Sequence, residues 1–268
     1  MQALSQIDHW EGEAGAIVVG ASGVLAEHGA VDRPGRWASV TKLVTAYAVL
    51  LAAELGQIDL DESAGPPGST VRHLLAHASG LPFEGLQPIS GPGRRRIYSN
   101  AGFDLLGALL EEHSNEQVTR YLRDRILGPL GIEATLAGRP SEGLLGDVRG
   151  IARLGTEFLA PTLVPAATLR AAQSVAFPGL PGTLPGVGRF DPLDWGLGFE
   201  VRSTKAPHWT GTLNSAPTCG HFGGSGTFLW VDPLAGVALA VSSGKEFGPW
   251  ALSAWPLLSD AVLTEVVA

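Results

Sequence analysis

The sequence predicts an α+β protein in which an antiparallel sheet of N- and C-terminal strands is flanked by helices and carries an inserted all-helical region. Short apolar strands with turn signals occur near both ends of the chain, and helical periodicity dominates its middle. A length of 268 residues and an apolar content of 45% suffice for a buried core without a metal or a disulfide. We therefore expect a sheet subdomain formed by residues 1–56 and 190–268, and a mainly helical inserted subdomain at residues 57–189.

The order of the elements supports this division. Residues 15–30 contain two apolar strands joined by a turn, and residues 40–55 are apolar on nearly all sides, as expected of a buried helix. Further helices are predicted in the middle of the chain, at residues 70–76, 100–112, 116–127, 147–159 and 165–172. Residues 177–191 are rich in glycine and proline and predict a loop. The C-terminal part predicts strands and a closing helix, at residues 195–201, 226–231, 236–243 and 249–267.

Charge and composition disfavour several classes of partner and site. The net charge of −8 disfavours nucleic acids and anionic membranes. Cys219 is the single cysteine, so no intramolecular disulfide can form. The N-terminus lacks a basic start and an early apolar run, and the longest apolar stretch, residues 43–53, is too short to span a membrane. We therefore expect a cytoplasmic protein, and the sequence does not indicate its oligomeric state.

Ser39 and Lys42 form an S-x-x-K pair at the start of the predicted buried helix. Residues three positions apart lie on one face of a helix, so the lysine can reach the serine hydroxyl. A serine is a poor nucleophile until a base takes its proton, and burial lowers the pKa of a lysine so that it can be that base. By themselves the two residues are equally consistent with a helix N-cap and a surface lysine. Ser242 and Lys245 repeat the spacing, but no helix starts there, so we interpret that copy as a turn.

Tyr98 and Asn100 form a Y-x-N pair in a loop before the helix predicted at residues 100–112. A nearby lysine ammonium would help Tyr98 to ionise, so that it could act as general base toward Ser39 and as general acid toward the leaving group. Asn100 could donate its side-chain amide to a substrate carbonyl. The structural alternative is that Asn100 caps the following helix and that Tyr98 packs at the base of the loop.

A glycine-rich segment that contains His221, Gly223 and Gly224 leads into the strand predicted at residues 226–231. Glycines beside a strand allow another molecule to approach the backbone closely. His221 would then line a pocket, and a backbone N–H of this segment could bind an oxyanion together with that of Ser39. The alternative is a glycine-rich β-turn with a solvent-facing histidine.

Two further clusters have simpler explanations. His73 and His77 are four residues apart, as zinc ligands can be, but no third ligand is evident nearby, so no metal site is expected. The run Arg94–Arg96 immediately precedes Tyr98. It is either a solvated surface segment or the source of one arginine for the rim of the pocket, where it would meet an anionic substrate.

The S-x-x-K, Y-x-N and H-x-G elements occur in the order typical of serine β-lactamases and penicillin-binding proteins, and the chain resembles that superfamily. It looks most like the class C branch and its related esterases and D-aminopeptidases. Supporting segments are spread over nearly the whole chain: LGQIDLDE (55–62), LLAHASGLP (74–82), WGLGF (195–199) and GHFGGSGTFLWVDP (220–233). The resemblance implies a β-lactamase/transpeptidase-like fold and no metal or organic cofactor.

The resemblance also implies an acyl-enzyme mechanism. Ser39 would attack a carbonyl carbon, and Lys42 and Tyr98 would transfer its proton. The N–H groups of Ser39 and Gly224 would bind the oxyanion. Water would then release the acyl group.

One departure from the superfamily pattern bears on the substrate. β-Lactamases and D,D-peptidases usually carry K-T-G as the third motif, whose lysine helps to bind the substrate carboxylate, whereas this chain has His221-Phe222-Gly223. A neutral histidine binds a carboxylate less well, and a histidine here resembles the esterase and D-aminopeptidase members. We therefore expect a hydrolase of small-molecule esters or amides. The alternatives are a D-aminopeptidase, a D,D-peptidase or a weak class C-type β-lactamase, and a penicillin-binding-like protein that binds a ligand without turnover.

Overall fold

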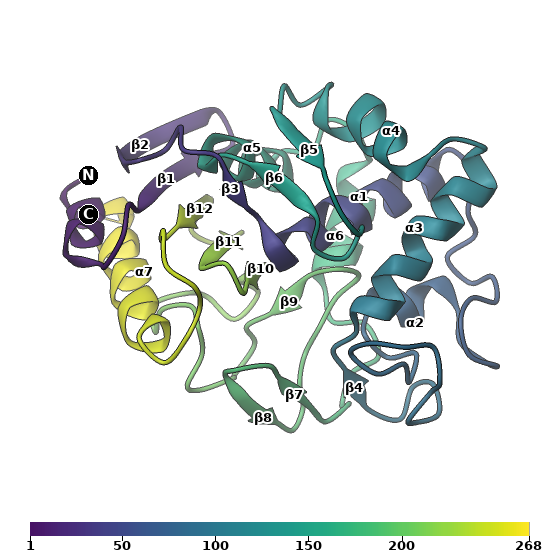
Figure 1. The fold of residues 1–268 in the computed structure, drawn as a ribbon. Coiled ribbons are helices and arrows are strands. Elements are labelled where there is room, and N and C mark those ends of the chain that lie inside the picture. Colours follow the sequence, from purple (N-terminus) through teal and green to yellow (C-terminus); the bar gives the residue numbers. More distant parts are fainter. Residues whose placement is uncertain (268) are drawn as a thin grey trace.

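The computed structural model describes residues 1–267 and confirms the predicted α+β architecture, with one large antiparallel sheet built from both ends of the chain (Figure 1). In spatial order the strands of this sheet are β2 (Gly23–Gly29), β1 (Gly15–Gly20), β12 (Val237–Ser242), β11 (Thr227–Asp232), β10 (Cys219–Gly223) and β9 (Glu200–Val201). The predicted N-terminal hairpin joins the C-terminal strands where β1 pairs with β12. The first and last parts of the chain therefore share one sheet.

Helices cover both faces of the large sheet (Figure 1). On one face lie α7 (Ala251–Val267) and the 3-10 helix η1 (Gln2–His9), and on the other lies α5 (Val148–Leu159), with α1 (Thr41–Glu54) in the same core. Successive strand residues point to opposite faces, so Val18 joins the core beneath α7 and Ile17 joins the core beneath α5. Among residues 1–267, none of the helices combines the length and the apolar character needed to cross a membrane.

The inserted region is mainly helical, but the prediction that it is all-helical is wrong. Each helix predicted there is present, as α2 (Val71–Leu75), α3 (Asn100–Ser114), α4 (Val118–Leu122) with the π-helical turn η3 (Arg123–Leu127), α5 and α6 (Ala166–Gln173). Short strands form two more three-stranded sheets, β3 (Gly35–Arg36), β6 (Leu144–Gly146) and β5 (Ala134–Leu136), and β4 (Arg96–Ile97), β7 (Gly182–Leu184) and β8 (Gly188–Phe190). Strands of two or three residues are too short to show a period of two, which is why the sequence does not reveal them.

Two segments near the end of the insert differ from their predictions. The segment predicted as a loop at residues 177–191 contains the β7–β8 hairpin. The strand predicted at residues 195–201 is reduced to β9 and a single bridge from Trp195 to Glu200. The φ of +92° at Gly198 lies outside the β region and interrupts it. The division of the chain at residues 56 and 190 stays a prediction.

Arg96 is buried, so the interpretation of the arginine run as a solvated surface segment is wrong for this residue. Its guanidinium donates hydrogen bonds to carbonyl oxygens at the end of α2 and around the β7–β8 hairpin: Ala76 (2.6 Å), Leu193 (2.5 Å), Phe177 (3.0 Å) and Ala176. Arg96 therefore ties the hairpin to α2. Because its donors are used in this way, it is not the arginine that would meet a substrate at a pocket rim.

Candidate active site

Ser39 lies in a single turn of 3-10 helix, η2 (Ala38–Val40), directly before α1. Ala38 has a φ of +45°, a left-handed conformation that is costly for a residue with a Cβ atom and persists only where the surroundings hold it. Here Thr227 of β11 donates a hydrogen bond of 2.8 Å from Oγ1 to the carbonyl oxygen of Trp37. The strand thus fixes the turn that carries Ser39 at the start of the buried helix.

Lys42 is completely buried in α1 and faces three oxygen atoms. Its Nζ lies 2.6 Å from Asn100 Oδ1, 2.9 Å from the carbonyl oxygen of Ser141 and 3.3 Å from Ser39 Oγ. Burial lowers the pKa of Lys42 to about 7, although nearby carboxylates, chiefly that of Glu142, oppose this effect. A neutral amine has two N–H groups, and the two carbonyl-type oxygens can only accept, so the lone pair faces Ser39. The surface-lysine alternative is therefore wrong.

Tyr98 lies close to Lys42 and among aromatic side chains. Lys42 Nζ is 4.7 Å from the centroid of its ring, and the ring centroid of His77 is 4.6 Å away. Burial raises the pKa of the Tyr98 phenol, and its hydrogen bond with Ser39 offsets only part of this effect. The prediction that Tyr98 ionises easily is therefore wrong, because the loss of water penalises the phenolate more than nearby groups favour it. Protonated Tyr98 can donate a proton, whereas the lowered pKa of Lys42 makes the neutral amine accessible near pH 7.

His221 lies in β10 with only 3% of its surface exposed, which rules out the solvent-facing alternative. Its Nδ1 is 2.7 Å from the carbonyl oxygen of Phe222, and because a carbonyl only accepts, Nδ1 carries the proton. Nε2 then has the lone pair and lies 3.5 Å from Tyr98 Oη. Burial, assisted by the positive charge of Lys42, lowers the pKa of His221 to about 3, so this imidazole is neutral at pH 7.

Gly223 and Gly224 lie where β10 passes the turn that carries Ser39. A Cβ atom on Gly223 would lie 2.5 Å from the carbonyl oxygen of Trp37 and 2.6 Å from Thr227 Oγ1, whereas a Cβ atom on Gly224 would meet nothing within 4 Å. Glycine at position 223 therefore lets β10 pack closely against η2. Gly224 lines the same pocket as Ser39, and the contact of its N–H with an oxyanion stays a prediction.

Gly223→Ala is expected to destabilise the protein by roughly 1–3 kcal/mol, because the added methyl group has no space between two fixed segments. The displacement of η2 would also lower kcat/KM on an ester substrate by a factor on the order of 10², because about 1 Å of misplacement is costly in catalysis. Thermal unfolding and ester kinetics measure both effects. Gly224→Ala is the matched control for stability and should leave the unfolding temperature unchanged. Equal unfolding temperatures for the two variants would contradict the packing argument.

Asn100 is the first residue of α3, but Ser99 is its cap, since Ser99 Oγ accepts a hydrogen bond from the N–H of Gly102. The Asn100 side chain is buried, with Oδ1 accepting from Lys42 and Nδ2 donating to Glu84 Oε1 at 3.1 Å. The predicted hydrogen bond from its amide to a substrate carbonyl is therefore not supported, because the amide is already used inside the protein. Its contacts make Asn100 a positioning residue for Lys42.

A cavity of about 240 Å³ opens beside Ser39, and its walls are mainly apolar. The lining residues are Ser39, Phe83, Tyr98, Leu184, Pro185, Gly186, His221, Phe222, Gly224 and Phe247. With His221 neutral, none of these described residues carries a charge at pH 7. The sequence does not predict the contributions of Phe83, residues 184–186 and Phe247, because nothing in the local pattern links them to the S-x-x-K helix.

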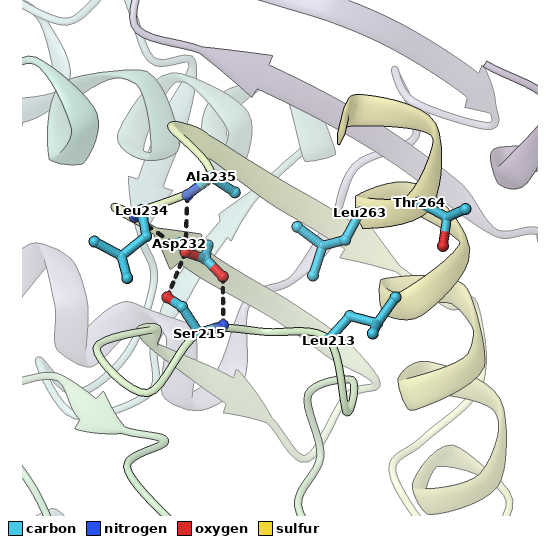
Figure 2. A pocket seen from close by; sticks show the side chains of 7 residues that line it. All are labelled: Leu213, Ser215, Asp232, Leu234, Ala235, Leu263 and Thr264. Atoms are coloured by element: carbon cyan, nitrogen blue, oxygen red, sulfur yellow. Dashed lines mark hydrogen bonds between the residues drawn. The ribbon is translucent and has the colours of Figure 1, made fainter. Parts of the chain in front are cut away.

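A larger hollow, of about 600 Å³, shares no lining residue with this cavity. Figure 2 shows it between α7 and the segment that carries Leu213, with Asp232 in its wall. The Asp232 carboxylate accepts hydrogen bonds from the backbone N–H groups of Ser215, Leu234 and Ala235. It therefore braces a turn, and the hollow offers no free base for catalysis.

The histidines at positions 73 and 77 have structural contacts. His77 Nδ1 accepts a hydrogen bond of 3.1 Å from the N–H of Ser99, and His73 stacks on Phe177 at a centroid distance of 4.2 Å. Within the described part of the chain, residues 1–267, no group of three or more histidine, cysteine, aspartate or glutamate side chains is arranged to hold a metal ion.

Known proteins are similar to nearly the whole chain. A family model described as Beta-lactamase matches residues 30–262. The crystal structure of a β-lactamase from Mycobacterium bovis has a TM-score of 0.97 to this structure and 47% sequence identity, covering 99% of this chain and 100% of that chain. The structure of a hydrolase with promiscuous acyltransferase activity shares the fold, with a TM-score of 0.79 and 16% identity over 97% of this chain and 96% of that chain.

The similarity to curated relatives is more limited. Monacolin J acid methylbutanoyltransferase of Aspergillus terreus is 31% identical over 38% of this chain and 37% of its own length. Penicillin-binding protein 4* of Bacillus subtilis is 28% identical over 37% of this chain and 29% of its own length. The similar region therefore spans less than half of the length of these relatives.

Proposed function

The chain belongs to the β-lactamase family, whose members are typically serine hydrolases or acyltransferases, and from this premise we propose that it forms an acyl-enzyme through Ser39 and hydrolyses small, uncharged esters or amides. One observation carries the proposal. The Nζ atom of Lys42, a buried lysine whose pKa burial lowers to about 7, lies 3.3 Å from the hydroxyl of Ser39, which lines a mainly apolar cavity.

In acylation, Lys42 removes the proton of Ser39 Oγ while this oxygen attacks the substrate carbonyl carbon. The negative charge that develops on the carbonyl oxygen is bound by the N–H groups of Ser39 and Gly224. Tyr98 donates its proton to the leaving group and regains one from the Lys42 ammonium, so that the site returns to its starting charge. Water then attacks the acyl-enzyme with Lys42 again as base, and Ser39 is released with its proton.

The charge of the pocket favours a neutral substrate. Lactams and D,D-peptides that this superfamily cleaves present a carboxylate, which the lysine of a K-T-G motif would bind. Here His221 stands at that position, and its imidazole is neutral because burial lowers its pKa to about 3. Burying a carboxylate beside uncharged, apolar walls costs free energy that no cation of the cavity offsets. An uncharged acyl group avoids this cost.

Lactam hydrolysis is the second candidate, because a protein 47% identical over nearly the whole chain is described as a β-lactamase. Lactam hydrolysis would require that a cationic group from outside the cavity reach the carboxylate of the lactam substrate. Substrate preference distinguishes the two candidates directly.

We expect turnover of p-nitrophenyl butyrate, with little turnover of a chromogenic cephalosporin or of D-alanine p-nitroanilide. Leu184→Ala enlarges the cavity and should shift the preference toward longer acyl chains by roughly 10-fold, since one or two methylene groups contribute about 1–3 kcal/mol of selectivity. Leu234→Ala, in the separate hollow of Figure 2, is the control and should leave the preference unchanged. Cleavage of the cephalosporin alone would support lactam hydrolysis, and a stable adduct without turnover would indicate a ligand-binding protein.

A further inference from the structure

Lys42 donates hydrogen bonds to Asn100 and to the carbonyl oxygen of Ser141, and both of these groups are anchored by carboxylates. Asn100, whose Oδ1 faces Lys42, donates from Nδ2 to Glu84 Oε1 at 3.1 Å. Ser141, whose carbonyl oxygen faces Lys42, donates from its backbone N–H to Asp104 Oδ1 at 3.3 Å. The position of the Lys42 amine therefore depends on acidic residues that do not touch it.

Arg139 binds these carboxylates together. Its Nη1 lies 2.7 Å from Glu84 Oε2 and 3.2 Å from Asp104 Oδ2. Its Nη2 lies 2.8 Å from Glu84 Oε1 and 2.8 Å from Glu142 Oε1. We call Glu84, Asp104, Arg139 and Glu142 the carboxylate clamp. Arg139 is thus linked to Lys42 by two chains of hydrogen bonds. One passes through Glu84 and Asn100, and the other passes through Asp104 and Ser141.

The carboxylate clamp also decides which way the Asn100 amide points. Carboxylate oxygens only accept hydrogen bonds, so the NH₂ group of Asn100 must face Glu84 and Glu142, whose Oε2 is 3.5 Å away. The Asn100 oxygen must then face Lys42. The reversed amide would place two donors against the lysine and an oxygen against the carboxylates.

We propose that the carboxylate clamp is a positioning device that holds Asn100 and Ser141 against Lys42 and sets the pH range in which Lys42 can act as a base. The proposal rests on the function proposed for Ser39. Three carboxylates against one guanidinium give the clamp an excess of negative charge, which favours the Lys42 ammonium. Arg139 has the opposite effect, and the net negative charge of the clamp offsets part of the effect of burial, which favours the neutral amine.

The charged and titratable groups around Lys42 come from several elements. They are Glu84 before β4, Tyr98 between β4 and α3, Asp104 in α3, Arg139 and Glu142 between β5 and β6, His77 after α2 and His221 in β10. Both histidines are neutral at pH 7, because burial lowers their pKa values, and Tyr98 is protonated. The carboxylate clamp therefore supplies the fixed charges that act on Lys42.

Lysine NMR tests the proposal without reference to any substrate. The chain has three lysines: Lys42, Lys205 and Lys245. Protein labelled with ¹³C at lysine Cε therefore gives three titrating signals, and Lys42→Met assigns the one of interest. Glu84→Gln keeps an acceptor for Asn100 but removes a charge, and should lower the titration midpoint of Lys42. Arg139→Gln should raise it. Because the clamp is partly exposed, each shift is expected to be roughly half a pH unit, and to shrink at high salt.

Arg149→Gln is the matched control, since Arg149 bridges Glu27 and Asp32 in the same manner at another place in the fold. It should leave the Lys42 midpoint unchanged. Shifts of opposite sign for Glu84→Gln and Arg139→Gln support the proposal. Unchanged midpoints, or shifts of the same sign in both variants, overturn it. If esters are turned over, the acidic limb of kcat/KM should move with each midpoint while KM stays constant. Absence of ester cleavage, together with Lys42 midpoints that move in opposite directions in Glu84→Gln and Arg139→Gln, would refute the proposed function and leave the role of the clamp intact.

Discussion

Ser39→Ala is expected to lower kcat/KM for p-nitrophenyl butyrate by a factor on the order of 10⁴, to the background rate, because it removes the hydroxyl that would attack the carbonyl carbon. Ser39 Oγ is the hydroxyl that the buried amine of Lys42 faces at 3.3 Å. The substitution removes one oxygen atom and leaves α1 and its core unchanged. The loss should therefore appear in the chemical step, with the unfolding temperature preserved.

Acid quenching followed by proteolysis and peptide mass spectrometry identifies the acylated residue independently of turnover. Wild type should gain the mass of one butyryl group on the peptide that contains Ser39, and Ser39→Ala should gain none. Ser242→Ala is the control, because Ser242 and Lys245 share the S-x-x-K spacing but lie at the end of β12, where Lys245 pairs with Glu11. Full activity in Ser39→Ala, or an adduct on another residue, would show that the nucleophile lies elsewhere.

The features that depend on neighbours in sequence can be predicted from the sequence. The contact between Ser39 and Lys42 follows from a spacing of three on a helix. The burial that lowers the pKa of Lys42 follows from the apolar character of the whole segment 41–54. The hairpin of β1 and β2 and the last two strands of the sheet are predictable for the same reason, since their patterns are local.

The features that depend on residues far apart in sequence could not be predicted. The carbonyl of Ser141 is 99 positions from Lys42, and a backbone acceptor leaves no mark in the choice of side chain. The Asn100 amide donates to Glu84 and faces Glu142, so its predicted contact with a substrate carbonyl is not supported. Arg96 looks like part of a charged surface run, yet its partners are carbonyl oxygens of loops that only the tertiary fold brings together.

Tyr98 shows that the sign of an electrostatic effect can also depend on the fold. A lysine nearby favours the phenolate, whereas enclosure by neighbouring groups disfavours it, and the sequence reveals the first effect but not the second. In the structure the second effect dominates, so the pKa of Tyr98 is raised. The directions of these pKa shifts therefore support the roles proposed above, with Lys42 as the base and Tyr98 as the acid.

Lys42→Met is expected to lower kcat/KM for esters by about 10³-fold, because it removes the general base and leaves Ser39 with its proton. It should also change how stability depends on pH. The pKa of Lys42 falls from 10.5 to about 7 on folding. Between these values the unfolded chain binds a proton that the folded chain does not, so the free energy of unfolding rises with pH. Below pH 7 both states are protonated, so the free energy of unfolding no longer changes with pH through Lys42, and the cost of burying the charged lysine is fully present.

For wild type, the rise due to Lys42 between pH 7 and pH 9.5 is about 3 kcal/mol, since each pH unit in this range contributes about 1.4 kcal/mol once the folded lysine is neutral. Lys42→Met should lack this rise, and urea unfolding at the two pH values measures the difference. Lys245→Met, which removes a partly exposed lysine, should retain it. Parallel pH profiles for wild type and Lys42→Met would mean that Lys42 is charged in the folded protein at pH 7 and above. A charged Lys42 has no lone pair to offer Ser39, so the same measurement decides between a base and a permanent cation at the centre of the site.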